Sequence, residues 1–371
     1  MNSKRRHGNR TAEHSLRMVS GLASAAVVAA CGGGSGTGGA SASPDDAVHA
    51  TIGPKGGELV GPAGSTVDGV HLVIPAGALT ADTDISIRPV DSETALPATA
   101  VRCGPEFTIE PAGLKLSVPA TLTLPFDETT VTAQDRFDDE VKVWILGANA
   151  WGQQLQTDSA PGAVTVQLDT LTVAAAGVNP PATTDIVHLT FKPNPKFASC
   201  LAANPGDATK APSVEADVVR GNLNDGLFLR GKNVKPGLQF DLFTVENSSL
   251  LANGTPDPNF KTFGLAWYQS DLEAEKNGTM RATIRTILLD QIFGFDPTVT
   301  LPPTGTFEMG FWFNDPQDAV ACGFDATKPT PFNGEHDAGP LAMITVPDAT
   351  TGLGPLCTKP DTSVTPARCD P

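Results

Sequence analysis

The chain has 371 residues, and 41 acidic against 25 basic side chains give it a formal net charge of −16. Nucleic acids and anionic lipid headgroups select basic patches, so this balance argues against both as partners. The 37 glycines and 32 prolines, with 17 Phe and one Tyr, are typical of short strands joined by turns and favour a mainly β fold.

The N-terminus has the layout of a secretory signal, which we place at residues 1–30. Five basic residues between Lys4 and Arg17 precede an uncharged, largely apolar stretch, Met18–Ala30. This stretch is too short to span a bilayer, which takes about 20 apolar residues. Val28-Ala29-Ala30-Cys31 resembles the lipobox of bacterial lipoproteins, which implies that Cys31 is acylated and becomes the first residue. Without residues 1–30 the formal charge is −20.

A flexible tether is predicted at residues 31–47, because 32–43 are almost all Gly, Ser, Ala and Thr and cannot bury a core. Gly32, rather than Asp, follows the cysteine, which resembles the sorting pattern for the outer membrane. Whether the chain faces the periplasm or the medium stays open. The alternative is a free Cys31 beside an ordinary cleavage site, but a tether fits an anchor better.

Two β-sandwich-like domains are expected beyond the tether, since about 325 residues exceed one typical core. The linker is placed at 179–184, where Asn179-Pro180-Pro181 cannot join a sheet ladder. The domains then cover 48–178 and 185–371. Short β-branched segments predict strands in the first domain at 72–74, 85–87, 122–124, 141–144 and 164–166.

Several segments of the first domain resemble a ZU5-type β-sandwich. They are Gly56-Gly57, His71–Leu79, Ile85–Ile87, Phe107–Gly113 and Pro119–Pro125. The resemblance implies a scaffold or interaction module. Some related domains cut themselves at a His-apolar-Ser/Thr tripeptide near their end, but Thr170-Leu171-Thr172 stands here and lacks the histidine that would act as base. We therefore expect no self-cleavage.

The second domain is predicted from strands with a period of two at 187–191, 238–242 and 307–313. Asn277-Gly278 predicts a two-residue hairpin turn that places Trp267 opposite Leu288. Segments 263–271, 311–316 and 330–339 resemble a domain of uncharacterised secreted bacterial proteins, which implies export but no activity.

Four cysteines of the second domain can form two disulfides in an oxidising compartment. Three connectivities are open. We favour Cys357 with Cys369, which are close in sequence, and Cys200 with Cys322. Cys103 is then unpaired and is expected to be buried as a small apolar residue.

Catalytic and metal motifs are scarce. The four histidines beyond residue 30 have no metal-ligand spacing, and no nucleophile elbow or phosphate loop occurs, so no catalytic residue, resident metal or cofactor is predicted. Two acidic groups, Asp315 with Asp318 and Glu335-His336-Asp337, could gather around Ca²⁺. The alternative, which we prefer, is turn chemistry beside Asn314 and Asn333.

Aromatic residues could form a platform for sugars or a groove for another protein, although such residues more often belong to the core. Trp312 lies on the face opposite Phe311 and Phe313 and is the first candidate for recognition. Tyr268 is a further candidate, in addition to the two acidic groups. The alternation of apolar and polar residues favours a core position for Trp267. The sequence therefore predicts an outer-membrane-anchored lipoprotein with a non-enzymatic binding, adhesion or scaffolding role toward a protein or glycan. The alternative is an envelope enzyme that acts on glycans through dispersed carboxylates.

Overall fold

The computed structural model describes residues 47–92, 94–155, 157–290, 296–328, 330 and 337–370. The signal, Cys31 and the tether as far as residue 46 lie outside these residues, as do Glu335 and His336. The described residues belong to one compact unit, Pro44–Pro371, which holds two separate main cores. We call residues 47–178 the N-terminal half and 186–370 the C-terminal half. The division into domains at 179–184 stays a prediction.

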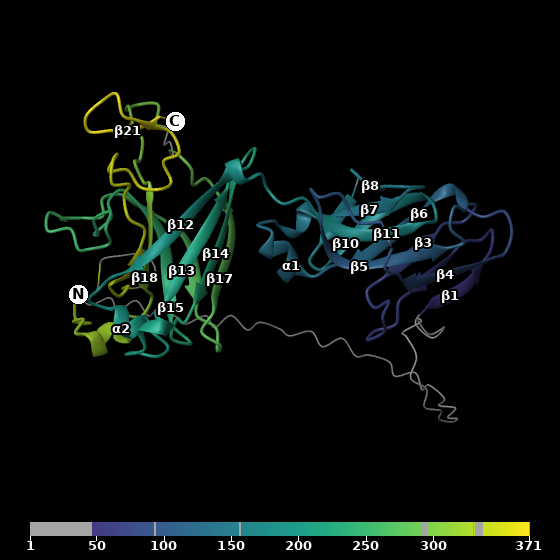
Figure 1. Ribbon diagram of the computed structural model, residues 1–371, viewed down its shortest axis with the longest axis horizontal. Helices are drawn as coiled ribbons and strands as arrows, with labels where there is room; N and C mark the ends of the chain where they lie inside the picture. Colours follow the sequence, from purple (N-terminus) through teal and green to yellow (C-terminus); the bar gives the residue numbers. More distant parts are fainter. Residues whose placement is uncertain are drawn as a thin grey trace, which may run out of the picture. The chain divides into compact units, whose positions relative to one another are not determined.

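The N-terminal half consists of two antiparallel sheets packed face to face (Figure 1). The six-stranded sheet has the order β1 (Val48–Ile52), β4 (Thr83–Pro89), β5 (Val101–Glu110), β11 (Val173–Val178), β7 (Lys142–Leu146) and β8 (Trp151–Gln153). The five-stranded sheet has the order β2 (Gly57–Val60), β3 (His71–Ile74), β6 (Lys115–Pro125), β10 (Ala163–Thr170) and β9 (Thr157–Ala160). A short helix, α1 (Glu128–Ala133), and the 3-10 turn η2 (Asp138–Glu140) precede β7.

The core of this half follows from the pleat, because alternate side chains of each strand point between the sheets. Ile85 and Ile87 of β4 and Leu122 and Leu124 of β6 are all fully buried there. All five strands predicted from the sequence are present, and the mainly β sandwich fold is confirmed.

Two glycines set the turns at the start of this half. Gly56 and Gly77 both have positive φ, 79° and 81°, which side chains with a Cβ rarely adopt. A Cβ on Gly56 would lie 2.5 Å from the Ile74 carbonyl oxygen, whereas one on Gly77 would meet nothing within 4 Å. The Gly77 amide donates to the Pro54 carbonyl, so the two turns are joined.

The C-terminal half is built on one eight-stranded antiparallel sheet that curls until it is nearly closed. Its order is β16 (Ala266–Glu273), β15 (Gln239–Val245), β18 (Glu308–Phe313), β19 (Leu341–Ile344), β12 (Ile186–Pro193), β13 (Ser213–Val219), β14 (Asp225–Lys232) and β17 (Met280–Thr286). The 3-10 turn η3 (Thr183–Asp185) precedes this half, whose remaining described elements are α2 (Ala198–Leu201), η4 (Ala208–Lys210), η5 (Pro316–Cys322), β20 (Pro360–Asp361) and β21 (Arg368–Cys369).

The turn at Asn277-Gly278 is present but differs from the predicted two-residue hairpin. The Gly278 amide donates to the Glu275 carbonyl, and Asn277 Oδ1 accepts from the Thr279 amide. Beyond the bridge between Ala274 and Met280 the strands separate, because β16 pairs with β15 and β17 pairs with β14. Trp267 therefore lies opposite Thr244 rather than Leu288, and that expectation was wrong.

Strand β18 is buried on both faces, although the alternation predicted a half-buried strand. Met309, Phe311 and Phe313 point into the main core of this half. The other face belongs to a second, smaller core that contains Trp312 and Leu250. The loop after β15 supplies this cover, and a period of two cannot reveal a loop that packs from elsewhere in the sequence.

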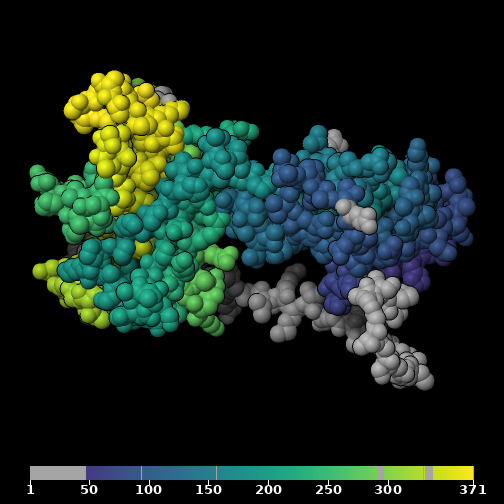
Figure 2. Space-filling model, viewed as in Figure 1, coloured from purple at the N-terminus to yellow at the C-terminus, as the bar shows by residue number. Residues whose placement is uncertain are grey.

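Both disulfides have the favoured connectivity, Cys200 with Cys322 and Cys357 with Cys369. The first ties α2 to η5, and the second closes the C-terminal segment, whose residues gather at one end of the half (yellow in Figure 2). Cys103 is free and buried, as expected, and burial raises the pKa of its thiol to about 12.

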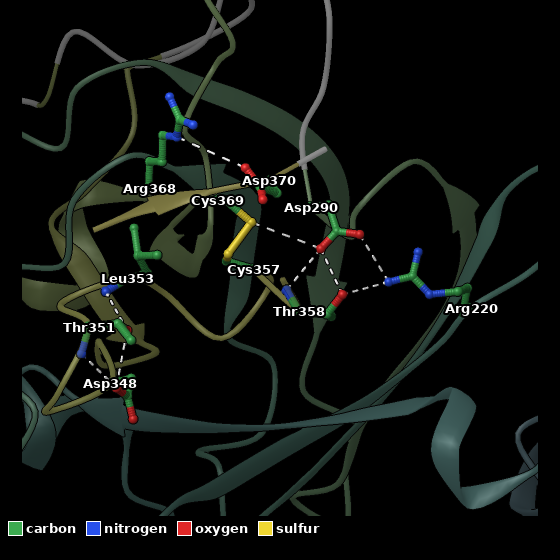
Figure 3. Close-up of a disulfide and its surroundings, with 10 residues drawn as sticks. All are labelled: Arg220, Asp290, Asp348, Thr351, Leu353, Cys357, Thr358, Arg368, Cys369 and Asp370. Atoms are coloured by element: carbon green, nitrogen blue, oxygen red, sulfur yellow. Dashed lines mark hydrogen bonds and ion pairs between the residues drawn. A yellow bond between two sulfur atoms is a disulfide. The ribbon is translucent and has the colours of Figure 1, made fainter. Parts of the chain in front are cut away.

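The buried Asp290 fixes the segment that carries the second disulfide (Figure 3). Its Oδ1 accepts from the Thr358 amide at 2.9 Å and from the Thr358 hydroxyl at 2.7 Å, and its Oδ2 accepts from Arg220 at 3.0 Å. Burial opposes ionisation of Asp290, but the hydrogen bonds from Thr358 and Arg220 outweigh it and lower the pKa of the carboxyl. The ionised carboxylate therefore joins the sheet to the C-terminal segment.

Candidate functional site

A cavity of about 340 Å³ opens where the loop after β15 meets the start of β18. We call it the Glu308 cavity. Its polar lining includes Glu246, Asp257, Lys261 and Glu308, and its apolar lining includes Phe260 and Pro347. Glu246 and Lys261 lie at the exposed rim, whereas Glu308 is only 2% exposed. The cavity is within the size range of small-molecule sites.

Strand register places Glu308 in this cavity. Glu308 is the first residue of β18 and pairs with Val245, the last residue of β15. Its neighbour Met309 points into the main core, so the pleat turns Glu308 to the outer face of the sheet. The chain that leaves β15 at Glu246 folds back over this face and forms the cavity wall.

Thr345, just after β19, holds the carboxyl of Glu308. The Thr345 hydroxyl donates to Glu308 Oε2 and accepts from the Met309 amide at 2.9 Å. It is the one hydrogen-bond donor to Glu308 within the described part of the chain. Burial therefore dominates and raises the pKa of Glu308 to about 7, although the Thr345 hydroxyl opposes the shift.

The loop over the cavity is held by hydrogen bonds to its own backbone and to β19. Glu246 Oε2 accepts from the Leu265 amide at 2.8 Å, and the Asn247 side chain donates to the Thr262 carbonyl at 3.3 Å. The Ser248 hydroxyl donates to the carbonyl of Thr345 at 2.8 Å. Thr345 thus contacts both the buried carboxyl of Glu308 and Ser248 in the cavity wall, so the same residue holds both in place.

Trp312, the first recognition candidate from the sequence, is 1% exposed. It does lie opposite Phe311 and Phe313, but Phe243 and Phe263 pack edge-on against its ring at 5.6 and 5.0 Å between centroids. The expectation of an exposed Trp312 was wrong because the outer face of β18 is covered by the loop after β15.

Among the residues that the structure describes, the exposed aromatic ones are instead Trp267 and Tyr268 on β16, at 44% and 52% exposure. Trp267 was expected in the core, and this expectation was also wrong, because β16 is an end strand of its sheet. The Tyr268 hydroxyl donates to Asp271 at 2.8 Å. Tyr268 therefore keeps its place among the candidates for recognition.

Of the predicted acidic groups the structure describes Asp315, Asp318 and Asp337, whereas Glu335 and His336 lie outside the described residues. Asp315 caps η5 by accepting from the Gln317 amide at 2.8 Å, the turn chemistry preferred from the sequence. Burial and the nearby Asp315 raise the pKa of Asp318, and Asp337 is exposed. Within the described residues no three His, Cys, Asp or Glu side chains are grouped to hold a metal ion.

Sequence reasoning missed Glu308. The signal was a single acid within an otherwise apolar strand, Phe307–Phe313, on the same face as the suspected Trp312. The sequence does not show that the loop after β15 returns to cover it. The structure thus brings the carboxyls of Glu246 and Glu308 to one cavity, which can accept hydrogen bonds from a bound cation or hydroxyl and can exchange a proton near neutral pH.

No helix in the described part of the chain is long and apolar enough to cross a bilayer. A search of curated proteins returns no match to the chain. A family model, that of the ZU5 domain, does match part of the N-terminal half. ZU5 domains mediate protein–protein interactions. Residues 48–138 match the ZU5 domain, which confirms the resemblance over β1 to β6, α1 and the start of η2.

Proposed function

We propose that this chain is a lipid-anchored binding protein of the bacterial cell envelope, which uses its ZU5 domain to bind or scaffold a protein partner. The match of residues 48–138 to a protein-interaction domain carries this proposal. The match covers about two thirds of the N-terminal half, from β1 to the start of η2.

The envelope location is supported by the sequence at the N-terminus. The stretch Val28–Cys31 resembles a lipobox, and the following tether gives an anchored domain reach from the membrane. Two disulfides in the C-terminal half fit an oxidising compartment such as the periplasm or the cell surface. Acylation of Cys31 would attach the chain to the outer membrane.

The anchor is tested by intact-mass analysis of protein from the membrane fraction. We expect a chain that starts at Cys31 and carries acyl mass, and we expect Cys31→Ala to leave the membrane fraction. The matched control is Cys103→Ala, which also removes a thiol and keeps the anchor. A wild-type chain without acyl mass would contradict the lipoprotein assignment.

The partner is tested by photo-crosslinking in intact cells. A photoreactive residue is placed at Val60 or Val118, which are exposed on the ZU5-matching segment at 54% and 39%. The controls are Leu223 and Val364, exposed in the C-terminal half at 91% and 38%. One discrete crosslinked protein at the ZU5 positions and none at the controls is expected. Crosslinks confined to the controls would place recognition outside the ZU5 domain.

A further inference from the structure

Glu308 has an unusual combination of burial, hydrogen bonding and access. The residue is only 2% exposed, yet it lines a cavity. Oε2 accepts from the Thr345 hydroxyl, while Oε1 receives no hydrogen bond from the described residues and is not among their fully enclosed, unsatisfied atoms. Oε1 therefore keeps some exposed surface and has no hydrogen-bond donor among the described residues.

Among the described residues, Glu308 has no cationic partner either. The influences on its carboxyl are burial and the Thr345 hydroxyl, and no basic group contributes. Lys261 lines the cavity, and the ion pairs of the described residues do not include one between Lys261 and Glu308, Glu246 or Asp257. Burying a carboxylate without a positive partner costs free energy. A cation bound in the cavity would offset this cost through a charge-assisted hydrogen bond to the carboxylate.

The remaining lining selects the kind of ligand. Three carboxyls, those of Glu246, Asp257 and Glu308, line the cavity with one ammonium, and this balance of charge disfavours an anionic ligand. The described residues offer no group of three metal ligands, which disfavours a metal ion. The apolar surfaces of Leu250, Leu251, Phe260 and Pro347 suit a ligand with a hydrocarbon part, and the ring of Phe260 can also attract a cation.

We propose that the Glu308 cavity binds a small organic amine in its protonated form. The ammonium group donates to Oε1 of Glu308, and its hydrocarbon part contacts the Leu250, Phe260 and Pro347 walls. This site is separate from the ZU5 domain, so the inference does not rest on the proposed function and can fail or succeed without it.

Calorimetric titration of the purified chain with three compounds of similar shape tests the ligand class. Benzylamine supplies a cation, benzyl alcohol a neutral hydroxyl and benzoate an anion. At pH 8 we expect benzylamine to bind and the other two to give no saturable heat. Equal binding of benzyl alcohol, binding of benzoate alone, or no binding of benzylamine would overturn the proposal.

The role of Glu308 is tested with Glu308→Gln, which keeps the shape and the acceptor for Thr345. This variant should bind benzylamine about tenfold more weakly or worse, because a charge-assisted hydrogen bond is lost. The control is Glu215→Gln, an exposed acid on β13 outside the cavity, which should bind like wild type. Equal affinities of Glu308→Gln and wild type would overturn the site.

The pH dependence gives a second measurement that needs no variant. Glu246, Asp257 and Lys261 are the other titratable groups that line the cavity. If ionised Glu308 is the form that binds, the affinity of wild type for benzylamine should fall about 30-fold from pH 8 to pH 5.5, over which the amine stays protonated. Carbon-13 NMR of the labelled carboxyl should show benzylamine lowering the pKa of Glu308. An unchanged pKa would contradict the contact.

Discussion

Thr345 joins the carboxyl of Glu308 to the backbone of the next residue along the strand, because its hydroxyl donates to Glu308 Oε2 and accepts from the Met309 amide. One hydroxyl thus satisfies a β18 amide and gives a buried acid its hydrogen bond. Among the described residues the Thr345 hydroxyl is the single hydrogen-bond donor to Glu308, so burial has the larger effect on the pKa of this carboxyl. The stability of the chain should therefore depend on the protonation of Glu308.

The first prediction concerns stability against pH. The pKa of Glu308 is raised from 4.5 to about 7, so the folded state holds a proton that the unfolded state releases between these values. Wild type should lose stability as pH rises from 4.5 to 7, by up to about 3 kcal/mol for this group. Glu308→Gln should remove the loss, which urea unfolding at pH 4.5 and pH 8 will measure. The same difference in the free energy of unfolding between wild type and Glu308→Gln at both pH values would refute this prediction.

The second prediction concerns the two glycine turns of the N-terminal half. Gly77→Ala should cost about 1 kcal/mol, since only the positive φ opposes it. Gly56→Ala should cost several kcal/mol more, because its Cβ would also collide with the backbone of Ile74 and Ala76. Thermal unfolding of the two variants compares them directly. Equal losses would mean that the backbone around Gly56 adjusts.

The third prediction concerns the disulfides. Cys200 and Cys322 are 122 residues apart and Cys357 and Cys369 are 12 apart. By chain entropy the longer loop should stabilise by about 5 kcal/mol and the shorter by about 3 kcal/mol. Paired Cys→Ser variants, unfolded in guanidinium, give the two costs. A larger cost for Cys357 with Cys369 would show that native contacts of the C-terminal segment, rather than loop closure, dominate.

The fourth prediction concerns Asp290. Asp290→Asn keeps the shape and tolerates the positive φ of 64°, but it weakens the hydrogen bonds to Thr358 and Arg220 and should cost about 1–3 kcal/mol at pH 7. The pKa of Asp290 is lowered from 3.8 in the folded state. Its contribution to stability is therefore fully present above pH 3.8 and is lost as the pH falls through the lowered pKa of the folded state. Chemical unfolding at pH 7 and pH 3 should show the difference between wild type and variant shrink. A difference that grows at pH 3 would contradict an ionised Asp290.

Local patterns predicted most of the strands, because a strand with one buried face carries that fact in its own alternation. Ile85 and Ile87 alternate with polar neighbours, and the structure buries both. The disulfide pairing was also accessible, since Cys357 and Cys369 are close in sequence and leave one partner for Cys200.

The surface was harder to predict, because exposure depends on segments that are distant in sequence. Trp312 and Trp267 exchange their expected roles, since a loop covers β18 and β16 lies at an end of its sheet. The Glu308 cavity has the same origin: the acid, the Thr345 hydroxyl and the Phe260 wall come from three separate segments. No periodicity in any one of these segments records the presence of the other two.

Cys103 belongs to neither disulfide, and its burial bears on whether those disulfides can exchange partners. A free thiolate attacks disulfides and exchanges partners with them, and only the deprotonated form reacts. Since burial holds the pKa of Cys103 at about 12, almost none of it is thiolate at neutral pH. Once the N-terminal core has formed around Cys103, its thiol therefore stays protonated and does not exchange with the two disulfides during oxidative folding.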